Sequence, residues 1–269
     1  MSELTLTKPS TLVDHDFESA YFIPAVYNRT YYSSVMQDEA MLIRWKAGPL
    51  TTYLRKKLDH LELDKFPSMF DAGSGPAIHH LLTFVNFAKT IHLSDYLEDN
   101  LAEIRKWVDK DQQAHDWKPF VTAVLTTEGL ESTPEAGLVR ARQVRKKIAS
   151  YSSIDLKKPL HKGLPHSHLL VTSFFVADSA TSSKNVFTAM TKRAFSIVAP
   201  GGVFVAAYLG GCSRYRVGRK WIASASITEE DIELAFKKSH AKKVKIWRFE
   251  TPEMAHDGFT HIFAVVAEK

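Results

Sequence analysis

From Pro67 onward, short apolar runs alternate with longer segments whose apolar residues recur at helical spacing. This alternation predicts an α/β fold with a parallel sheet covered by helices on both faces, because parallel strands need crossover connections. We predict strands at 68–72, 90–94, 120–125 or 150–154, 168–174, 202–208, 243–249 and 259–267. We predict the helices between them at 79–88, 99–109, 134–149, 183–198 and 228–239.

The end of the chain departs from this alternation, since no clear helical segment separates the runs 243–249 and 259–267. The last strand is therefore expected to insert antiparallel into an otherwise parallel sheet. The helix before these runs has a clear start, because Thr228 can cap it together with Asp231.

Residues 11–62 are rich in aromatic side chains and predict helices, with apolar positions at helical spacing from Met36 to Leu58. Gly48-Pro49 interrupts or restarts this pattern. The predicted organisation is an N-terminal helical cap over the active site at 1–62, followed by the main domain at 63–269, in a single structural unit.

The net charge of +5 and the pI near 9.1 raise the question of a nucleic-acid partner. The basic residues are scattered, and their densest group, at 140–147, is explained by a solvated helix face, so we expect no such partner. The single cysteine, Cys212, excludes an intrachain disulfide and a zinc site built on cysteines. Neither a signal peptide nor a long apolar run is visible, and we expect a cytoplasmic monomer or homodimer without membrane contact.

A glycine-rich turn follows the first predicted strand, in the segment Phe70-Asp71-Ala72-Gly73-Ser74-Gly75-Pro76. Glycine lets the chain reverse sharply and brings bare backbone close to a ligand. A dinucleotide fingerprint would require a third glycine where Ile78 stands, and Pro76 also departs from that pattern. Asp71 at the strand end either orients the loop or meets a cationic ligand, which favours a ligand without phosphate; a plain tight turn is the alternative.

A second acidic residue, Asp95, ends the next predicted strand, about 20 residues beyond the turn. A carboxylate at this position can accept both hydroxyl groups of a ribose. Asp95 could instead cap the following helix, but Asp99 is better placed for that role.

At this point the chain resembles a known family of small methyltransferases, which includes nicotinamide, phenylethanolamine and indolethylamine N-methyltransferases and thioether S-methyltransferase. The resemblance rests on elements in the same order along most of the chain: Tyr27-Asn28-Arg29-Thr30-Tyr31-Tyr32, the Gly-Ser-Gly-Pro turn, Ser94-Asp95-Tyr96, Asn100-Leu101, His115-Asp116-Trp117-Lys118-Pro119, Ile154-Asp155-Leu156 and Ala199-Pro200-Gly201-Gly202. It implies a seven-stranded Rossmann-like methyltransferase sheet and S-adenosyl-L-methionine as cofactor, with S-adenosyl-L-homocysteine as product.

The resemblance also implies roles for single residues. Tyr27 and Tyr32 would close over the cofactor, Asp95 would take its ribose hydroxyls, and Asp155 with the Leu156 amide would meet the adenine. His79 either contacts the cofactor or simply begins the next helix. The full set of expected cofactor contacts is Tyr27, Tyr32, Asp71, Gly73, Ser74, Gly75, His79, Asp95, Tyr96, Asn100, Asp155, Leu156 and Phe174.

The chain departs from the family at the acceptor site. Amine methylators of the family carry a carboxylate where Tyr208 stands here, and a phenol with a reference pKa near 10 cannot neutralise an ammonium. A heteroaromatic nitrogen, a thiol or a hydroxyl group is thus at least as plausible an acceptor as an aliphatic amine. The expected acceptor contacts are Tyr208, Ser213 and Tyr215, and Tyr27, Tyr208 and Ser213 are expected to position the reactants.

The loop after Tyr208 and the histidines leave further alternatives. Arg214 and Arg216 either bind an anionic group of the acceptor or are exposed loop charges. His161, His166 and His168 superficially resemble a metal cluster, but no acidic residue at ligand spacing joins them, and we expect no metal. The favoured function is N-methylation of a small molecule by direct in-line transfer. S- or O-methylation and a catalytically idle, cofactor-binding regulator remain alternatives, and a nicotinamide-dependent oxidoreductase is disfavoured by Pro76.

Overall fold

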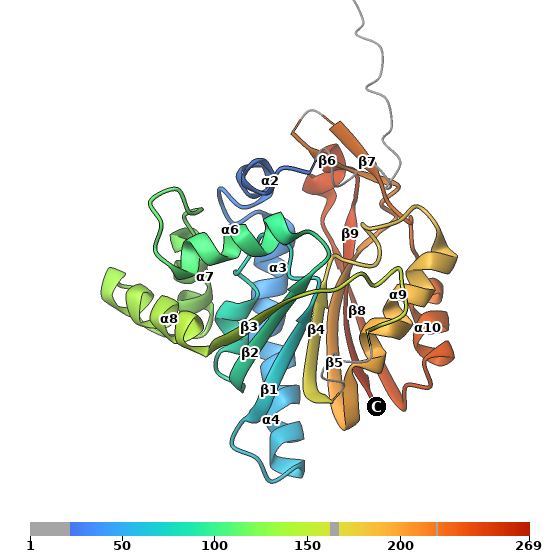
Figure 1. The fold of residues 1–269 in the computed structure, drawn as a ribbon, viewed down its shortest axis with the longest axis horizontal. Helices are drawn as coiled ribbons and strands as arrows, with labels where there is room; N and C mark the ends of the chain where they lie inside the picture. The colour runs from blue at the N-terminus through green and yellow to red at the C-terminus, as the bar shows by residue number, and fades with distance from the viewer. Residues whose placement is uncertain (1–21, 162–166, 219) are drawn as a thin grey trace, which may run out of the picture.

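The computed structural model describes residues 22–161, 167–218 and 220–269. Its centre is a seven-stranded sheet in the order β3-β2-β1-β4-β5-β9-β8, in which β9 alone runs antiparallel to its two neighbours (Figure 1). This confirms the α/β fold class and the antiparallel last strand. The strands are β1 (Phe66–Ala72), β2 (Ala88–Asp95), β3 (Ile148–Ser153), β4 (His168–Phe174), β5 (Val198–Gly210), β8 (Lys243–Glu250) and β9 (His261–Glu268).

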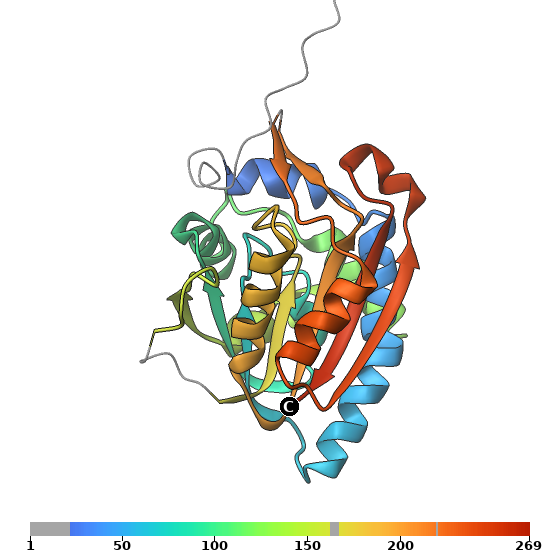
Figure 2. The same ribbon diagram turned by 90° about the vertical axis from the view of Figure 1, so that its right-hand side faces the viewer.

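Two helices, α9 (Lys184–Ser196) and α10 (Glu229–Lys238), cover one face of the sheet (Figure 2). The predicted cap of α10 is confirmed, since the side chains of Thr228 and Asp231 form a capping box. The helices of the other face are α3 (Gln37–Trp45), α4 (Thr51–His60), α5 (Leu81–Phe84), α6 (Glu98–Val108), α7 (Lys118–Thr127) and α8 (Pro134–Lys147).

Alternation along β5 divides its side chains between these two layers. Phe204, Ala206 and Tyr208 pack in the cluster under α9 and α10, whereas Val205 and Leu209 belong to the cluster on the opposite face. Such alternation follows from the pleat of a strand, in which successive side chains point to opposite faces. The face on which a β5 residue lies therefore follows from whether its number is odd or even.

The carboxyl ends of the parallel strands meet at one edge of the sheet, where the ribbon also places helix α2 (Pro24–Tyr31) (Figure 1). The same edge carries a hairpin formed by β6 (Arg214–Val217) and β7 (Lys220–Ala223), which the sequence reading treated as a loop. A short 3-10 helix, η3 (Pro252–Asp257), contacts α3 near this edge.

Several predicted elements are corrected by the structure. Of the alternatives for the third strand, 150–154 is right and 120–125 is wrong, because the latter lies in α7. The predicted helix at 79–88 is reduced to α5, and side chains of α8 bind carbonyl groups of this region: Arg140 binds Leu82 O, and Lys147 binds Val85 O and Ala88 O.

These contacts also correct the reading of the basic group at 140–147 as a solvated face. Arg140 is buried and pairs with Glu128 at 2.6 Å, and Arg145 stacks on Trp107. Arg142 and Lys146 are exposed, as expected. At the other interruption, Gly48-Pro49 lie in a π-helix (Lys46–Leu50) that joins α3 directly to α4.

Candidate active site

The glycine turn begins directly after β1 and requires its glycines. Gly73 and Gly75 have φ angles of 84° and 59°, in the left-handed region that favours glycine. A Cβ on Gly73 would lie 2.6 Å from the side chain of Val176, so no larger residue fits there without movement. The amides of Gly73 and Ser74 both donate to Ser94 O, at 2.9 and 2.7 Å, which anchors the turn to β2.

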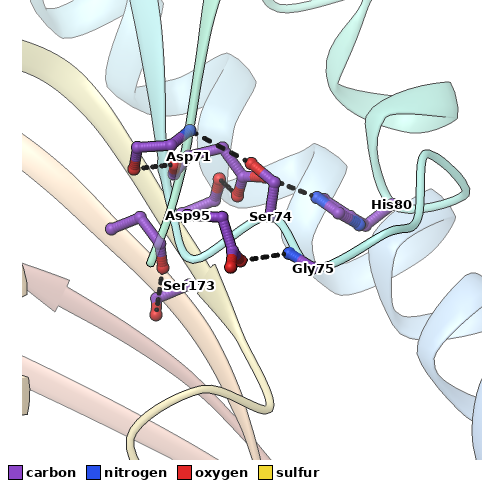
Figure 3. A network of polar contacts seen from close by, with 9 residues as sticks. Asp71, Ser74, Gly75, His80, Asp95 and Ser173 are labelled. Atoms are coloured by element: carbon purple, nitrogen blue, oxygen red, sulfur yellow. Dashed lines mark hydrogen bonds and ion pairs between the residues drawn. The ribbon is translucent and has the colours of Figure 1, made fainter. Parts of the chain in front are cut away.

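Asp95 at the end of β2 connects this turn to α6. Its Oδ2 accepts a hydrogen bond from Gly75 N at 2.8 Å (Figure 3), and its Oδ1 accepts from Leu97 N at 2.8 Å and Asn100 Nδ2 at 2.9 Å. Asp95 therefore holds three segments in place at the mouth of the pocket, while Asn100 Oδ1 has no hydrogen-bond partner.

Asp71 lies beneath the turn rather than in the pocket. It is fully buried; its Oδ1 accepts from Thr172 Oγ1 at 2.6 Å, and its Oδ2 lies 2.8 Å from His80 Nε2 (Figure 3). Burial raises the pKa of this carboxyl, but His80 and Thr172 more than offset that effect and hold the pKa below its usual value. The structure thus gives Asp71 the supporting position under the glycine turn that was one of its two expected roles.

One pocket joins these residues to the rest of the carboxyl edge. Its lining includes Asp95, Tyr96, Leu97 and Asn100, from the end of β2 and the start of α6, and residues 154–157, which follow β3. Tyr96 is 58 % exposed. The predicted contacts that line the pocket are Tyr27, Tyr32, Gly73, Ser74, Gly75, His79, Asp95, Tyr96, Asn100, Asp155, Leu156, Phe174 and Tyr215.

Tyrosines of α2, together with Tyr32 directly after it, form an aromatic wall of the pocket. The ring of Tyr27 lies 5.0 Å from that of Tyr31 and 5.7 Å from that of Tyr32, and all three line the pocket. Tyr31 is fixed by the hairpin, since its hydroxyl donates to Arg216 O at 2.7 Å and accepts from Arg216 N at 3.0 Å. Burial raises the pKa of each tyrosine above its usual value, so the phenols are neutral at physiological pH.

His79 lies next to the tyrosine wall, with its ring 4.5 Å from that of Tyr32. His79 Nε2 lies 3.1 Å from Glu39 Oε1, and its ring stacks against Trp117. Burial lowers the pKa of His79 to about 4, so its ring is neutral at physiological pH, and His79 Nδ1 has no hydrogen-bond partner. Lys46 is buried behind this pair, with its ammonium over the Phe174 ring.

Two expected acceptor contacts lie outside the pocket. Tyr208 is 1 % exposed and packs edge-on against Phe187 of α9, 5.3 Å away, because it occupies an even-numbered position of β5. Leu209, the next residue, lines the pocket instead. Ser213 is exposed at the base of the hairpin, where its carbonyl accepts from Ser224 N.

The hairpin arginines have partners within the chain. Arg216 pairs with Asp257 at 3.6 Å, and the guanidinium of Arg214 lies over the Trp221 ring. Among the described residues no group of three or more His, Cys, Asp or Glu could hold a metal; His166 of the histidine group lies outside them.

Sequence reasoning missed Asp38 and Glu39, both of which line the pocket from the first turn of α3. A signal was present: both residues lie three to four positions before Leu42 and Ile43, the buried positions of the same helix. Acidic side chains on the buried face of a helix indicate a functional or paired role, since isolated charges are costly to bury.

The residues of the pocket fit S-adenosylmethionine. The bare backbone at Gly73 allows close approach, and two residues of the lining, Asn100 and His79, each have a buried atom without a hydrogen-bond partner, Oδ1 and Nδ1. Asp95 and Asp155 add carboxylates to the lining.

Comparisons with known proteins agree with this assignment. The family model described as the NNMT/PNMT/TEMT family matches residues 10–269. Nicotinamide N-methyltransferase of Homo sapiens is 28% identical over 234 residues, which is 86% of each chain. Indolethylamine N-methyltransferase of Oryctolagus cuniculus is 26% identical over 217 residues, which is 80% of each chain.

Solved structures share the fold at low sequence identity. Phosphoethanolamine N-methyltransferase 2 of Haemonchus contortus, in complex with S-adenosyl-L-methionine, is 12% identical with a TM-score of 0.53, covering 96% of this chain and 60% of that one. The DhpI–SAH complex is 11% identical with a TM-score of 0.51 and covers 94% and 96%. From the family match along nearly its whole length, the chain belongs to the NNMT/PNMT/TEMT family and is an S-adenosylmethionine-dependent methyltransferase of small molecules.

Proposed function

We propose that this enzyme methylates a nitrogen atom of a small aromatic molecule, which is held in the arm of the pocket between α2, the β6–β7 hairpin and Phe259. The observation that carries this proposal is that one pocket is lined both by the carboxylates Asp95 and Asp155 and by the aromatic side chains of Tyr27, Tyr31, Tyr215 and Phe259. We assign the carboxylates to a cofactor arm and the aromatic residues to an acceptor arm. Aromatic side chains favour a flat apolar ligand. Relatives of this chain are named for N-methylation of nicotinamide, indolethylamine and phenylethanolamine, all of which carry nitrogen on or near a ring.

The cofactor arm is proposed to bind adenosine through carboxylates. Asp95 takes the ribose hydroxyls, with Asn100 Oδ1 as a further acceptor, and Asp155 with the Leu156 amide takes the adenine. The methionine end lies against Gly73 and Ser74, with Tyr27, Tyr32 and His79 around it. A neutral His79 suits this place, since an imidazolium would repel the nearby sulfonium.

S-adenosylmethionine supplies an electrophilic methyl group on its sulfonium. The protein needs chiefly to align the acceptor with that methyl group and to exclude water. Helix α2 is proposed to act as the cap that does this, since the hydroxyl of Tyr31 ties it to the backbone of Arg216 in the hairpin. The neutral phenols of Tyr27 and Tyr32 then present hydroxyl groups and ring faces without competing as nucleophiles.

We further propose a cytoplasmic location and a monomer or homodimer. No helix in the part of the chain that the structure describes is long and apolar enough to cross a membrane. Cys212 is buried, and burial raises the pKa of its thiol to about 12, so it is not poised for disulfide exchange. Sedimentation of the purified protein and fractionation of the source cells test these two points.

The acceptor is tested by a labelled-methyl assay with full-length enzyme over pyridines, arylalkylamines, thiols and phenols, followed by mass spectrometry of each product. The proposal expects the label on nitrogen of an aromatic compound. Label on sulfur or oxygen in every productive reaction would overturn N-methylation while leaving the family assignment intact. Cofactor binding without turnover of any compound would instead favour a regulatory, catalytically idle role.

A further inference from the structure

One carboxylate that lines the pocket makes no ion pair with a described residue. Four carboxylates line the pocket. Asp95 holds the glycine turn and α6, Asp155 accepts from Lys157 N and pairs with Lys158, and Glu39 Oε1 lies 3.1 Å from His79 Nε2. Asp38 is the fourth; the backbone N–H groups of Asp38 and Glu39 stabilise its carboxylate, but its buried Oδ1 has no hydrogen-bond partner.

Asp38 is buried, with an exposed fraction of 8 %, and no ion pair with a described residue compensates its charge. A buried carboxylate without a counter-charge costs free energy, so a protein retains one where a ligand completes it. Burial is the main cause that raises the pKa of Asp38 to about 7; the charges of Glu39 and Asp257 act in the same direction, and the backbone N–H groups of Glu39 and Asp38 act against it. A cation placed beside such a carboxyl group would stabilise its charged form.

The surroundings of Asp38 suit an organic cation. The charge of Asp38 contributes to the raised pKa of Tyr27 and of Tyr32, and the rings of Tyr27 and Tyr31, 5.0 Å apart, line the same pocket as Asp38. Ring faces attract ammonium groups, and a carboxylate within such a wall supplies the counter-charge. Asp38 therefore lines the same pocket as the tyrosines of α2, and its helix α3 also contacts η3.

We propose that Asp38 binds the nitrogen of a protonated primary or secondary arylalkylamine and accepts its proton before methyl transfer. This inference rests on the proposed function and narrows its acceptor class. It assigns to the start of α3 the carboxylate that the chain lacks at position 208, where Tyr208 faces the opposite side of the sheet.

The proton and charge balance closes with the groups present. The ammonium gives one proton to the Asp38 carboxylate, and the freed lone pair forms the N–C bond as the C–S bond breaks. The electrons of that bond return to sulfur, which becomes a neutral thioether, and the methylated nitrogen carries the positive charge away. Asp38 then releases its proton to solvent.

The test compares Asp38→Asn with the unmodified enzyme on three acceptors of similar size: phenethylamine, quinoline and thiophenol. Asparagine keeps the shape and removes the charge. We expect kcat/KM for phenethylamine to fall at least roughly 30-fold, as for loss of one partner of a buried charge pair, while the Kd for S-adenosylmethionine changes less than about 3-fold. The matched control is Glu229→Gln, which removes an exposed carboxylate from the first turn of α10.

A second readout separates contact with the amine from a structural role. In the unmodified enzyme kcat/KM for phenethylamine should rise with pH as Asp38 ionises, and this rise should vanish in Asp38→Asn; Glu39, Asp257, Tyr27 and Tyr32 face the same region and are unchanged in both proteins. Thermal unfolding should show equal or higher stability for Asp38→Asn, because the substitution removes a buried charge that makes no ion pair with a described residue.

Binding of phenethylamine to the S-adenosylhomocysteine complex, measured by calorimetry, provides the same comparison without turnover. Equal binding and equal kcat/KM in the two proteins would overturn the inference, as would a preference of the unmodified enzyme for quinoline or thiophenol. A preference for quinoline, with methylation at its nitrogen, would overturn the inference about Asp38 but would support the proposed function. Methylation confined to thiophenol would contradict both.

Discussion

The amide of Gly75 donates to the carboxylate of Asp95 over 2.8 Å, so the first and second strands of the sheet are joined at the mouth of the pocket. The bond holds the glycine turn against the residue proposed to bind ribose. Cofactor affinity therefore depends on the turn and on Asp95 together.

Asp95→Asn is expected to weaken S-adenosylmethionine binding by roughly 10- to 100-fold, since hydrogen bonds to charged groups contribute about 1.5–3 kcal/mol. Calorimetric titration of the cofactor measures the change. The control is Asp99→Asn, which removes an exposed carboxylate from the first turn of α6 and should leave affinity within about 2-fold. Equal Kd values for the two variants would remove Asp95 from the cofactor site.

Gly73→Ala should destabilise the fold by about 1–3 kcal/mol, because a left-handed backbone and a contact with Val176 both oppose the added methyl group. Gly137→Ala is the matched control. Gly137 lies within α8, and a Cβ added there would meet the side chain of Val121 at an ordinary 3.5 Å. Alanine has the higher helix propensity, so this control should keep or raise stability. Urea denaturation compares the two, and a Gly73→Ala protein as stable as the control contradicts the geometry.

Tyr208→Phe tests the sequence-based role of this residue directly. Because the ring packs against Phe187 under α9, we expect kcat/KM to change less than about 3-fold, with at most about 1 kcal/mol of lost stability. Tyr215→Ala, on the pocket side of the hairpin, should raise KM for the acceptor at least roughly 10-fold by removing an aromatic wall. Steady-state kinetics measures both variants. A larger loss of kcat/KM in Tyr208→Phe than in Tyr215→Ala would contradict the placement of Tyr208 outside the pocket.

Asp178 is expected to make the free energy of unfolding depend on pH. It is fully buried, and burial raises its pKa to about 7, while Leu209 N donates to its Oδ2 at 2.8 Å. The folded protein holds this proton more tightly than the unfolded chain, whose carboxyl has a pKa near 3.9. The stabilising contribution is therefore complete below about pH 4 and is lost as the pH rises through about 7.

Asp178→Asn keeps an oxygen for Leu209 N and cannot ionise. Its free energy of unfolding, relative to that of the unmodified protein, should therefore rise between pH 4 and pH 8, a window set by the pKa of about 3.9 in the unfolded chain and about 7 in the folded protein. Urea denaturation at each pH measures the difference between the two proteins. A constant difference over this range would show that Asp178 does not titrate there.

Much of the fold was predictable because its signals are local. The strand before Gly73, the antiparallel end of the sheet and the Thr228 cap each follow from a few neighbouring residues, and the structure confirms them. The helix expected at 79–88 failed because Arg140 and Lys147 of α8 bind carbonyl groups in that region. Such distant contacts leave no mark in the local pattern.

The site likewise contains residues that local sequence signals predicted and residues that only the assembled fold reveals. Asp95 and the glycines stand at strand ends, where an α/β sheet places its ligands, and the structure brings them to one pocket. The face of the sheet on which Tyr208 lies depends on the register of β5, which position in the sequence alone did not settle. Asp38 comes from a helix that the topology brings to the carboxyl edge, so its place in the pocket emerged only from the assembled fold.

The central claim is that this pocket binds S-adenosylmethionine. The most direct measurement is isothermal titration calorimetry of the full chain with S-adenosylmethionine and, separately, with S-adenosylhomocysteine. The account predicts one site per chain, with Kd values on the order of micromolar for both ligands and competition between them. The absence of binding heat for both ligands at several temperatures would contradict the account.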